Sequence, residues 1–369
     1  MKILFSANSS FYIYKFRLSI IRSLADQGYE IHIVAPKDKY TDMLKEEKVH
    51  YHKLNLDPIG INLIKEINSL YQIIRIYKKI SPHIIFNSTI KLNIYGSIAN
   101  FAKNSFCVNN VTGLGSFFAH NGPKKWLAIF LYKISKRGVD HIFFQNMEDM
   151  EYFFDLNIAK KQNSTLIPGS GVDTQYFKRK KSKKSKKFRF TFASRIIKEK
   201  GILDFIEASK ILSKEYNDIV FNIYGSIDNK RKKYISENDI TSLIHNFESI
   251  KYNGHTDDIK QVLESTDCLV LPTFYREGTP KILLEACSME IPIIATNLYG
   301  NKRVLKDSYN GLYCKESDII NIKNKMKEIY KLDDQEKKQM GSNGRSLVIE
   351  KFDIEILTKI YKNIIFKNL

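Results

Sequence analysis

The sequence contains little cysteine, and no two of its cysteines form a CxxC pair. The four cysteines are scattered over 369 residues, mostly among apolar neighbours, so neither a zinc site nor a disulfide framework is indicated. No DxD sequence occurs, and no cluster of histidine, cysteine and acidic residues has the spacing of metal ligands. We therefore expect a protein that needs no metal ion and that resides in a reducing cytoplasm.

Long hydrophobic runs are also missing. The apolar stretches, such as residues 84–86 and 268–272, have the length of a strand and are far too short to cross a bilayer. The N-terminal MKILFSA is followed at once by a polar NSS, which a secretory signal would not have. The length suffices for two domains, each with its own core.

Acidic residues are outnumbered, with 40 Asp and Glu against 59 Lys and Arg, which leaves a formal charge of +19. Such an excess favours anionic partners, namely lipid headgroups, nucleic acid or nucleotide phosphates. The chain is also rich in lysine, isoleucine and asparagine together. The alternative is therefore a compositional bias that only adds charge to a solvated surface.

One theme repeats along the chain: a short β-branched or aromatic run, a loop, and then a helical period. This alternation predicts parallel α/β sheets whose strands are buried on both faces. Residues 177–190 interrupt it with nine basic residues and no acid, which cannot form a core. We therefore expect an N-terminal domain over 1–173, a basic linker over 174–187, and a second domain over 188–351. An amphipathic helix over 352–369 can pack back across either domain.

The stretch REGTPKILLEACSMEIPIIATN, residues 276–297, predicts a helix that begins beside an anion site. Thr279 is a suitable N-cap, and Pro280 suits the first helical position, where its missing N–H costs nothing. The helix then runs from Lys281 to Ser288. The first backbone N–H groups of this helix have no partner within the helix, and they point with the positive end of its dipole toward the region beyond Gly278. An anion can bind there.

Two cations and a glycine follow other strands of the second domain. Arg195 comes after the strand FRFTFAS, with Lys200 five residues later, and Gly225, the last residue of NIYG, begins another loop. Ligands of open α/β sheets bind beyond the carboxyl ends of the strands, so Arg195 and Lys200 can approach one diphosphate. The alternative is that both are ordinary surface charges.

Taken together, these blocks resemble the retaining glycosyltransferases often grouped as glycosyltransferase family 4. The resemblance rests on SRIIKEKG (Arg195–Gly201), on an E-x(7)-E block from Glu277 to Glu285, and on PGSGVDTQYF around Gly171–Phe177, in matching order over residues 165–315. It implies the GT-B fold, in which two Rossmann-like, doubly wound parallel-sheet domains face each other across a cleft. The first domain would bind the acceptor and the second the nucleotide sugar.

The resemblance also implies roles for individual residues. Arg195 and Lys200 would hold the diphosphate of a UDP-sugar and stabilise the charge that builds up as the sugar bond breaks. Glu285 would accept hydrogen bonds from the ribose, and Glu277 would face the transferred sugar. The donor would also contact Gly225, Gly278, Thr279, Pro280 and Lys281. The alternative is that the two glutamates are exposed residues flanking a core helix.

The resemblance implies a front-face reaction without a protein nucleophile, in which cationic side chains take the place of a metal ion. Several positions depart from the family. The loop Ser6–Ser10 lacks the usual glycines, Lys302 and Arg303 occupy a region that is usually acidic, and Asn109, Asn110 and Thr112 stand where many members have a histidine. His255 follows a strand end and is either close to the nucleotide base or an ordinary loop residue.

Residues 122–138, GPKKWLAIFLYKISKRG, mix Trp and other large apolar residues with five cations. A helix of this kind can lie in a membrane interface with its lysines toward anionic headgroups, although a helix half-buried on its own sheet has the same pattern. The chain is similar to enzymes that extend undecaprenyl-diphosphate-linked glycans for bacterial capsule, O-antigen or glycoprotein assembly.

We thus expect transfer of a hexose or N-acetylhexosamine from a UDP-sugar to a lipid-linked saccharide, peripherally on the inner face of the cytoplasmic membrane. A first alternative is a UDP-sugar epimerase of the same fold, although the E-x(7)-E spacing disfavours it. A second is a nucleic-acid-binding protein. The basic segment, however, has only flanking phenylalanines and no recognisable binding module, so we expect no nucleic-acid partner.

Overall fold

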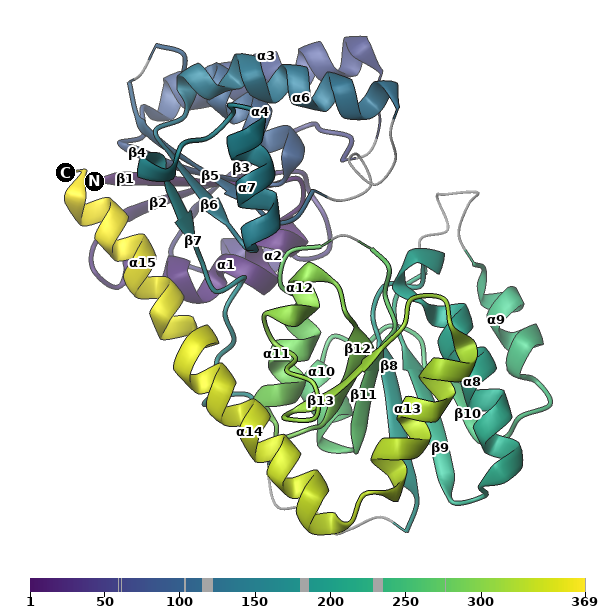
Figure 1. Ribbon diagram of the computed structural model, residues 1–369. Helices are drawn as coiled ribbons and strands as arrows, with labels where there is room; N and C mark the ends of the chain where they lie inside the picture. The colour runs from purple at the N-terminus through teal and green to yellow at the C-terminus, as the bar shows by residue number, and fades with distance from the viewer. Residues whose placement is uncertain are drawn as a thin grey trace. The chain divides into compact units, whose positions relative to one another are not determined.

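The computed structural model describes the whole chain except residues 59, 61, 103, 115–121, 180–185, 228–234, 276 and 369. The chain forms two units (Figure 1). The first comprises Met1–Gly171, Glu277–Thr279 and Ile354–Leu369, and the second Val172–Arg276 and Pro280–Asp353.

The first unit is built on a parallel sheet of seven strands in the order β3-β2-β1-β4-β5-β6-β7. The chain moves to the far side of β1 when it reaches β4, as in doubly wound folds. Short β-branched and aromatic runs form the strands because both faces are covered, and β4, for example, is buried at every residue. The strands are β1 Lys2–Ser6, β2 Glu30–Ala35, β3 His50–Lys53, β4 Ile84–Ser88, β5 Phe106–Val111, β6 His141–Phe144 and β7 Ser164–Leu166.

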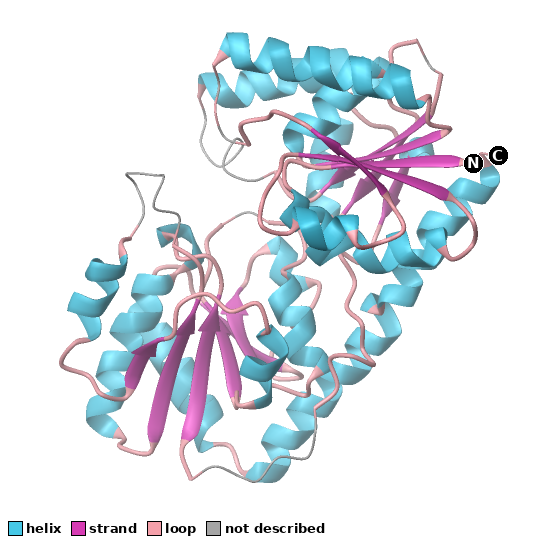
Figure 2. Ribbon diagram, turned by 180° about the vertical axis from the view of Figure 1, so that it is seen from behind, coloured by secondary structure: helices cyan, strands magenta, loops and turns pink. Residues whose placement is uncertain are grey.

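Helices cover both faces of this sheet (Figure 2). One apolar core lies under α1 and α15, and two further clusters lie under α3, α4, α6 and α7. The helices are α1 Ser10–Ala25, α2 Thr41–Lys45, α3 Leu63–Ile80, α4 Ile90–Ala99, α6 Pro123–Ser135, α7 Met147–Asp155 and α15 Ile354–Lys367, with 3-10 turns η1 Lys136–Gly138 and η2 Lys161–Asn163.

The second unit holds a parallel sheet of six strands in the order β10-β9-β8-β11-β12-β13, around one large apolar core. The strands are β8 Phe188–Ala193, β9 Ile219–Tyr224, β10 Ile250–Tyr252, β11 Cys268–Leu271, β12 Ile293–Thr296 and β13 Gly311–Cys314. The helices are η3 Lys198–Lys200, α8 Ile202–Glu215, α9 Glu237–Ile244, α10 Ile259–Glu264, α11 Lys281–Ser288, α12 Tyr299–Lys302, α13 Ile319–Lys331 and α14 Asp334–Phe352.

The predicted fold class, two Rossmann-like parallel-sheet domains, is confirmed. The C-terminal helix α15 packs on the first unit, where Leu357, Tyr361 and Ile365 are part of the core. Of the predicted basic linker, residues 180–185 lie outside the described residues, and residues 172–179 belong to the second unit. The predicted division at residues 173 and 174 stays a prediction.

All four cysteines are buried as free thiols. Across the residues that the structure describes, no group of histidine, cysteine and acidic side chains is arranged to hold a metal ion. Within the same residues, no helix combines the length and the apolar character needed to cross a membrane.

Candidate functional site

Two loops at the carboxyl edge of the second sheet are bound to each other. The carbonyl of Glu199, in η3 after β8, accepts hydrogen bonds from the Thr273 hydroxyl at 3.0 Å and from the Phe274 N–H at 2.9 Å, both in the loop after β11. Gly201 makes this approach possible, because a Cβ there would lie 2.1 Å from the Pro272 carbonyl oxygen and its φ is +76°. The turn that carries Lys200 is thus held at a defined place beside β11.

Arg195 and Lys200 share one aromatic ring at this edge. The Arg195 guanidinium lies 5.6 Å and the Lys200 ammonium 5.3 Å from the centroid of the Tyr275 ring. Lys200 is only 5% exposed, whereas Arg195 is exposed. Cation–π contacts of this kind attract a cation to the ring face and strengthen as water is excluded. Tyr275 is not among the residues predicted from the sequence, where its one signal is an aromatic residue directly before REGTP.

Gly225 follows β9 at the same edge and is in close backbone contact with the end of β8. A Cβ at Gly225 would lie 1.9 Å from the Ser194 carbonyl oxygen, directly before Arg195. Its N–H donates to the Gly254 carbonyl at 2.8 Å, and its own carbonyl accepts from the Tyr252 hydroxyl at 3.0 Å. Any larger residue would therefore displace the strand end that positions Arg195.

Helix α11 follows the loop that carries Tyr275, and its predicted extent, Lys281–Ser288, is confirmed. The predicted cap is wrong by one residue. Pro280, at φ −64° and ψ 119°, is the N-cap, and its carbonyl accepts the first helical hydrogen bond from the Leu283 N–H at 3.2 Å. Thr279 cannot cap the helix because its hydroxyl donates to the Gln145 carbonyl at 3.1 Å instead.

Glu285 lies one turn into α11 and is 7% exposed. Its carboxylate oxygen lies 3.9 Å from the Lys281 ammonium, so the two form an i, i+4 ion pair along the helix. Burial, followed by the charges of Asp258, Glu264 and Glu285, raises the pKa of Tyr176.

The tripeptide Glu277–Thr279 belongs to the first unit. The Gly278 N–H donates to the Thr112 carbonyl at 3.2 Å, and a Cβ at Gly278 would lie 2.4 Å from Oε1 of Gln145. The structure therefore brings Arg195, Lys200 and Gly225 together at one edge and places Glu285 on a neighbouring helix of the same unit. Glu277 belongs to the first unit, next to Gly278, whose N–H is bonded to Thr112.

Two of the positions that depart from the family, and also His255, have hydrogen-bond partners. Asn109 and Asn110 are buried in β5, where the Asn109 amide donates to the Asn93 carbonyl at 3.1 Å and the Asn110 amide donates to the Tyr361 hydroxyl at 3.1 Å. His255 follows β10, and its Nε2 lies 3.1 Å from Oδ1 of Asp257. The two asparagines thus support the core of the first unit.

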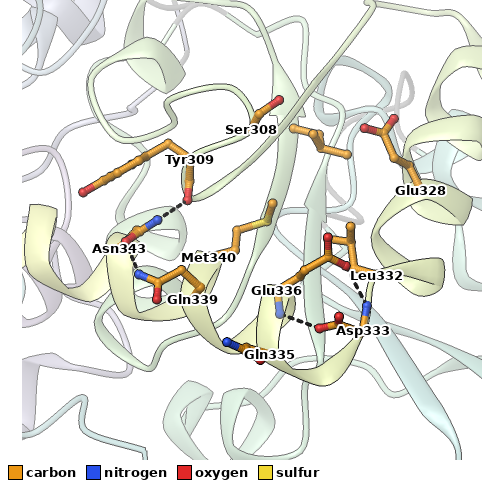
Figure 3. Close-up of a pocket in the computed structure, with 11 residues that line it drawn as sticks. Ser308, Tyr309, Glu328, Leu332, Asp333, Gln335, Glu336, Gln339, Met340 and Asn343 are labelled. Carbon is orange, nitrogen blue, oxygen red and sulfur yellow. Dashed lines mark hydrogen bonds between the residues drawn. The ribbon is translucent and has the colours of Figure 1, made fainter.

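The second unit also has a surface pocket of about 460 Å³ (Figure 3). It lies at the amino end of β13, and its lining comes from the residues around that strand end, from the end of α13 and from the first half of α14 with its N-cap. Asp333 and Glu336 in that lining cap each other's backbone N–H groups at 2.8 Å. Because the strands are parallel, this pocket is at the opposite edge of the sheet from Arg195 and Lys200.

Two protein-family models match the chain. A family described as "Glycosyl transferases group 1" matches residues 173–347, and a family described as "Glycosyl transferase 4-like" matches residues 2–146. Together with the two parallel sheets, these matches define the class: the chain is a glycosyltransferase with the GT-B fold and belongs to these two domain families. They support glycosyl transfer over the epimerase alternative.

The similar proteins belong to the same class. The chain is 25% identical over 345 residues to the N,N'-diacetylbacillosaminyl-diphospho-undecaprenol alpha-1,3-N-acetylgalactosaminyltransferase of Campylobacter jejuni, covering 88% of each chain. It is 28% identical over 317 residues to the UDP-Gal:alpha-D-GlcNAc-diphosphoundecaprenol alpha-1,3-galactosyltransferase of Escherichia coli, covering 80% of this chain and 78% of that protein. Among solved structures, Anabaena HepE in complex with UDP aligns over 100% of both chains with a TM-score of 0.81 and 16% identity, which shows the shared fold.

Proposed function

We propose that this glycosyltransferase is a retaining enzyme that moves a hexose or N-acetylhexosamine from a UDP-sugar to a polyprenyl-diphosphate-linked saccharide. The observation that carries the proposal is the pair of cations, Arg195 and Lys200, on one tyrosine ring at the carboxyl edge of the second sheet. A guanidinium fork beside a compact ammonium suits a diphosphate. The names of the C. jejuni and E. coli relatives support the acceptor class, and the UDP in the HepE complex supports the donor.

Each residue of the site has a role in this proposal. Arg195 and Lys200 bind the diphosphate, Glu285 accepts hydrogen bonds from the ribose hydroxyls, and Glu277 contacts hydroxyls of the transferred sugar. The backbone N–H groups at the start of α11 add a positive dipole end. Gly225 leaves room for the backbone that lies beside the nucleotide. The first domain, over 1–173, receives the acceptor.

The reaction we propose needs no protein nucleophile. The bond between the anomeric carbon and the β-phosphate oxygen breaks, and the acceptor hydroxyl oxygen bonds to the same face of that carbon. The departing phosphate oxygen takes the hydroxyl proton, so the anomeric configuration is retained. The charge that develops on the diphosphate is stabilised by Arg195 and Lys200, which do the work that a divalent ion does in other transferases.

We also propose that the protein acts peripherally on the inner face of the bacterial cytoplasmic membrane, where a lipid-linked acceptor is embedded. The predicted interfacial helix corresponds to α6 and η1, and Lys124, Lys133, Lys136 and Arg137 are exposed there. Such cations favour anionic headgroups by about 1 kcal/mol each near the surface.

The test is incubation with a panel of UDP-sugars and a short polyprenyl-diphosphate saccharide, with NMR of the product. Transfer from one donor with retained anomeric configuration is expected. Isomerisation of the donor without transfer would indicate an epimerase, and an inverted product would overturn the front-face reaction. Glu285→Ala is expected to weaken UDP binding in calorimetry, and an unchanged affinity would remove Glu285 from the donor site.

A filter-binding assay with RNA and DNA at physiological salt tests the expectation of no nucleic-acid partner. Binding that disappears as salt is raised and that ignores sequence would reflect the charged surface alone.

A further inference from the structure

Helix α3 carries two apolar stripes, and only one of them is buried in the core of the first unit. Ile73, Tyr77 and Ile80 are buried against the first sheet. The second stripe faces solvent and recurs at helical spacing, so its members share one side of the helix. It consists of Leu63, Ile64, Ile67, Tyr71 and Ile74, with exposed fractions between 39% and 75%. Single exposed apolar residues are ordinary, but a stripe of five marks a surface that contacts something else.

A buried ion pair fixes which side of α3 faces outward. The Lys91 ammonium, on α4, lies 2.5 Å from the Glu66 carboxylate, and the Tyr95 hydroxyl donates to the other oxygen of that carboxylate at 2.6 Å. Lys91 is 8% exposed and also donates to the Asp57 and Gly60 carbonyls. Because Glu66 points inward, its neighbours Ile64 and Ile67 are held outward. The exposed stripe is therefore a fixed feature of the fold.

Helix α6 extends the same surface. Its exposed apolar residues are Trp126, Leu127, Phe130 and Ile134, with exposed fractions between 38% and 66%. Both α3 and α6 pack against α4, and Figures 1 and 2 draw the two helices alongside each other on one side of the first unit. We name these nine exposed apolar residues of the two helices the α3–α6 surface.

The charged residues of the helices that carry the α3–α6 surface, together with those of η1, are almost all positive. Glu66 is the only acid in the two helices, and it is paired inside the unit. The cations of the two helices and of η1 are Lys65, Arg75, Lys78, Lys79, Lys124, Lys125, Lys133, Lys136 and Arg137. Apolar side chains including Trp and Tyr, combined with cations, are typical of helices that lie in a membrane interface.

We propose that the α3–α6 surface docks onto an anionic lipid bilayer, with α3 contributing an apolar stripe that enters the interface beside α6. This deepens the peripheral attachment proposed above and rests on it. A second copy of the chain fits the surface poorly, because a twofold contact would bring the exposed cations of these helices against the same cations of the copy. A bilayer rich in anionic headgroups takes up both the apolar residues and the charge.

Co-sedimentation with vesicles of phosphatidylglycerol and phosphatidylcholine tests the proposal on the full chain. The double variant Ile64→Ser, Ile67→Ser is expected to lower partitioning by about 10- to 100-fold, since two large apolar side chains leave the lipid. The double variant Lys78→Ala, Lys79→Ala is expected to lower it by about tenfold or more on anionic vesicles only. The matched control is Ile320→Ser, Ile349→Ser, because these exposed residues lie on α13 and α14 of the second unit.

Equal partitioning of the wild type and the Ile64→Ser, Ile67→Ser variant would overturn the proposal, as would an equal loss in the control. Light scattering measures the mass of the protein in solution. A wild type that is a dimer and an Ile64→Ser, Ile67→Ser variant that is a monomer would show that the surface binds a second copy, and would overturn the proposed bilayer contact. The thermal unfolding temperature of each variant checks that folding is intact. Sugar transfer to a water-soluble acceptor analogue should be unchanged in the Ile64→Ser, Ile67→Ser variant. A wild type that binds vesicles but transfers no sugar would refute the proposed function and leave the proposed bilayer contact standing.

Discussion

Replacing Lys200 by alanine removes the buried ammonium from the carboxyl edge of the second sheet. Lys200 is 5% exposed and lies 5.3 Å from the Tyr275 ring centroid, so little water competes with a bound diphosphate for its charge. Two unit charges about 4 Å apart interact by about 4 kcal/mol at an effective dielectric constant of about 20. The loss of one donor that stabilises a transition state costs about 2.7–4 kcal/mol in other enzymes.

Each 1.36 kcal/mol corresponds to about a tenfold change in rate, so kcat/KM is expected to fall by about 100- to 1,000-fold. The assay is the initial rate of sugar transfer to a short polyprenyl-diphosphate saccharide, measured with the UDP released. Lys198→Ala is the matched control, because Lys198 is an exposed lysine of the same turn, η3. Lys200→Arg keeps the charge and should retain part of the activity.

The role of Lys200 would be refuted by a Lys200→Ala enzyme whose kcat/KM stays within about threefold of the wild type. An equal loss in Lys198→Ala would also refute it, because the effect would then belong to the general charge of the turn. Calorimetry with UDP separates the two contributions. A weaker affinity for UDP reports ground-state binding, and a loss in kcat alone reports stabilisation of the transition state.

Three further predictions concern other parts of the molecule. Tyr275→Leu should lower kcat/KM by about 3- to 30-fold because Arg195 and Lys200 lose the ring face, whereas Tyr275→Phe should retain activity; equal losses in both would point to the hydroxyl instead. A chelator should leave transfer unchanged, and a strict need for an added divalent ion would contradict the proposed chemistry. Burial lowers the pKa of His32 and of His52 below their ordinary 6.5. The unfolded chain then binds more protons below about pH 6.5, so stability falls as the pH drops through this range. Thermal unfolding near pH 5.5 should thus occur at a lower temperature than near pH 7.5, with a smaller difference in His52→Gln; a pH-independent midpoint would contradict this.

The strands and most helices of both sheets could be predicted because their signals are local. Runs such as residues 84–86 are wholly apolar, which is the pattern of a strand covered on both faces, and Lys281–Ser288 combines a helical period with a preceding proline. The helix cap failed because Thr279 bonds to the Gln145 carbonyl, a partner 134 positions away that no local pattern contains.

Other features depend on packing that the sequence does not specify. An amphipathic period indicates that the C-terminal helix has an apolar face, but not that this face would pack on the first unit through Tyr361. The outer stripe of α3 was missed because apolar residues on two sides of a helix look like one broad buried face. Tyr275 was missed because its contacts with Arg195 and Lys200 exist only once two loops are bound together.

The assignment of α15 to the first unit has a consequence for how the protein is made. Leu357, Tyr361 and Ile365 complete a core whose other members lie almost entirely before residue 172. The first unit therefore cannot complete its interior until residues 354–369 have been synthesised, after the whole of the second unit. A fragment that stops at residue 171 would leave that apolar groove open to solvent, and a synthetic peptide spanning residues 354–369 is the piece that would close it.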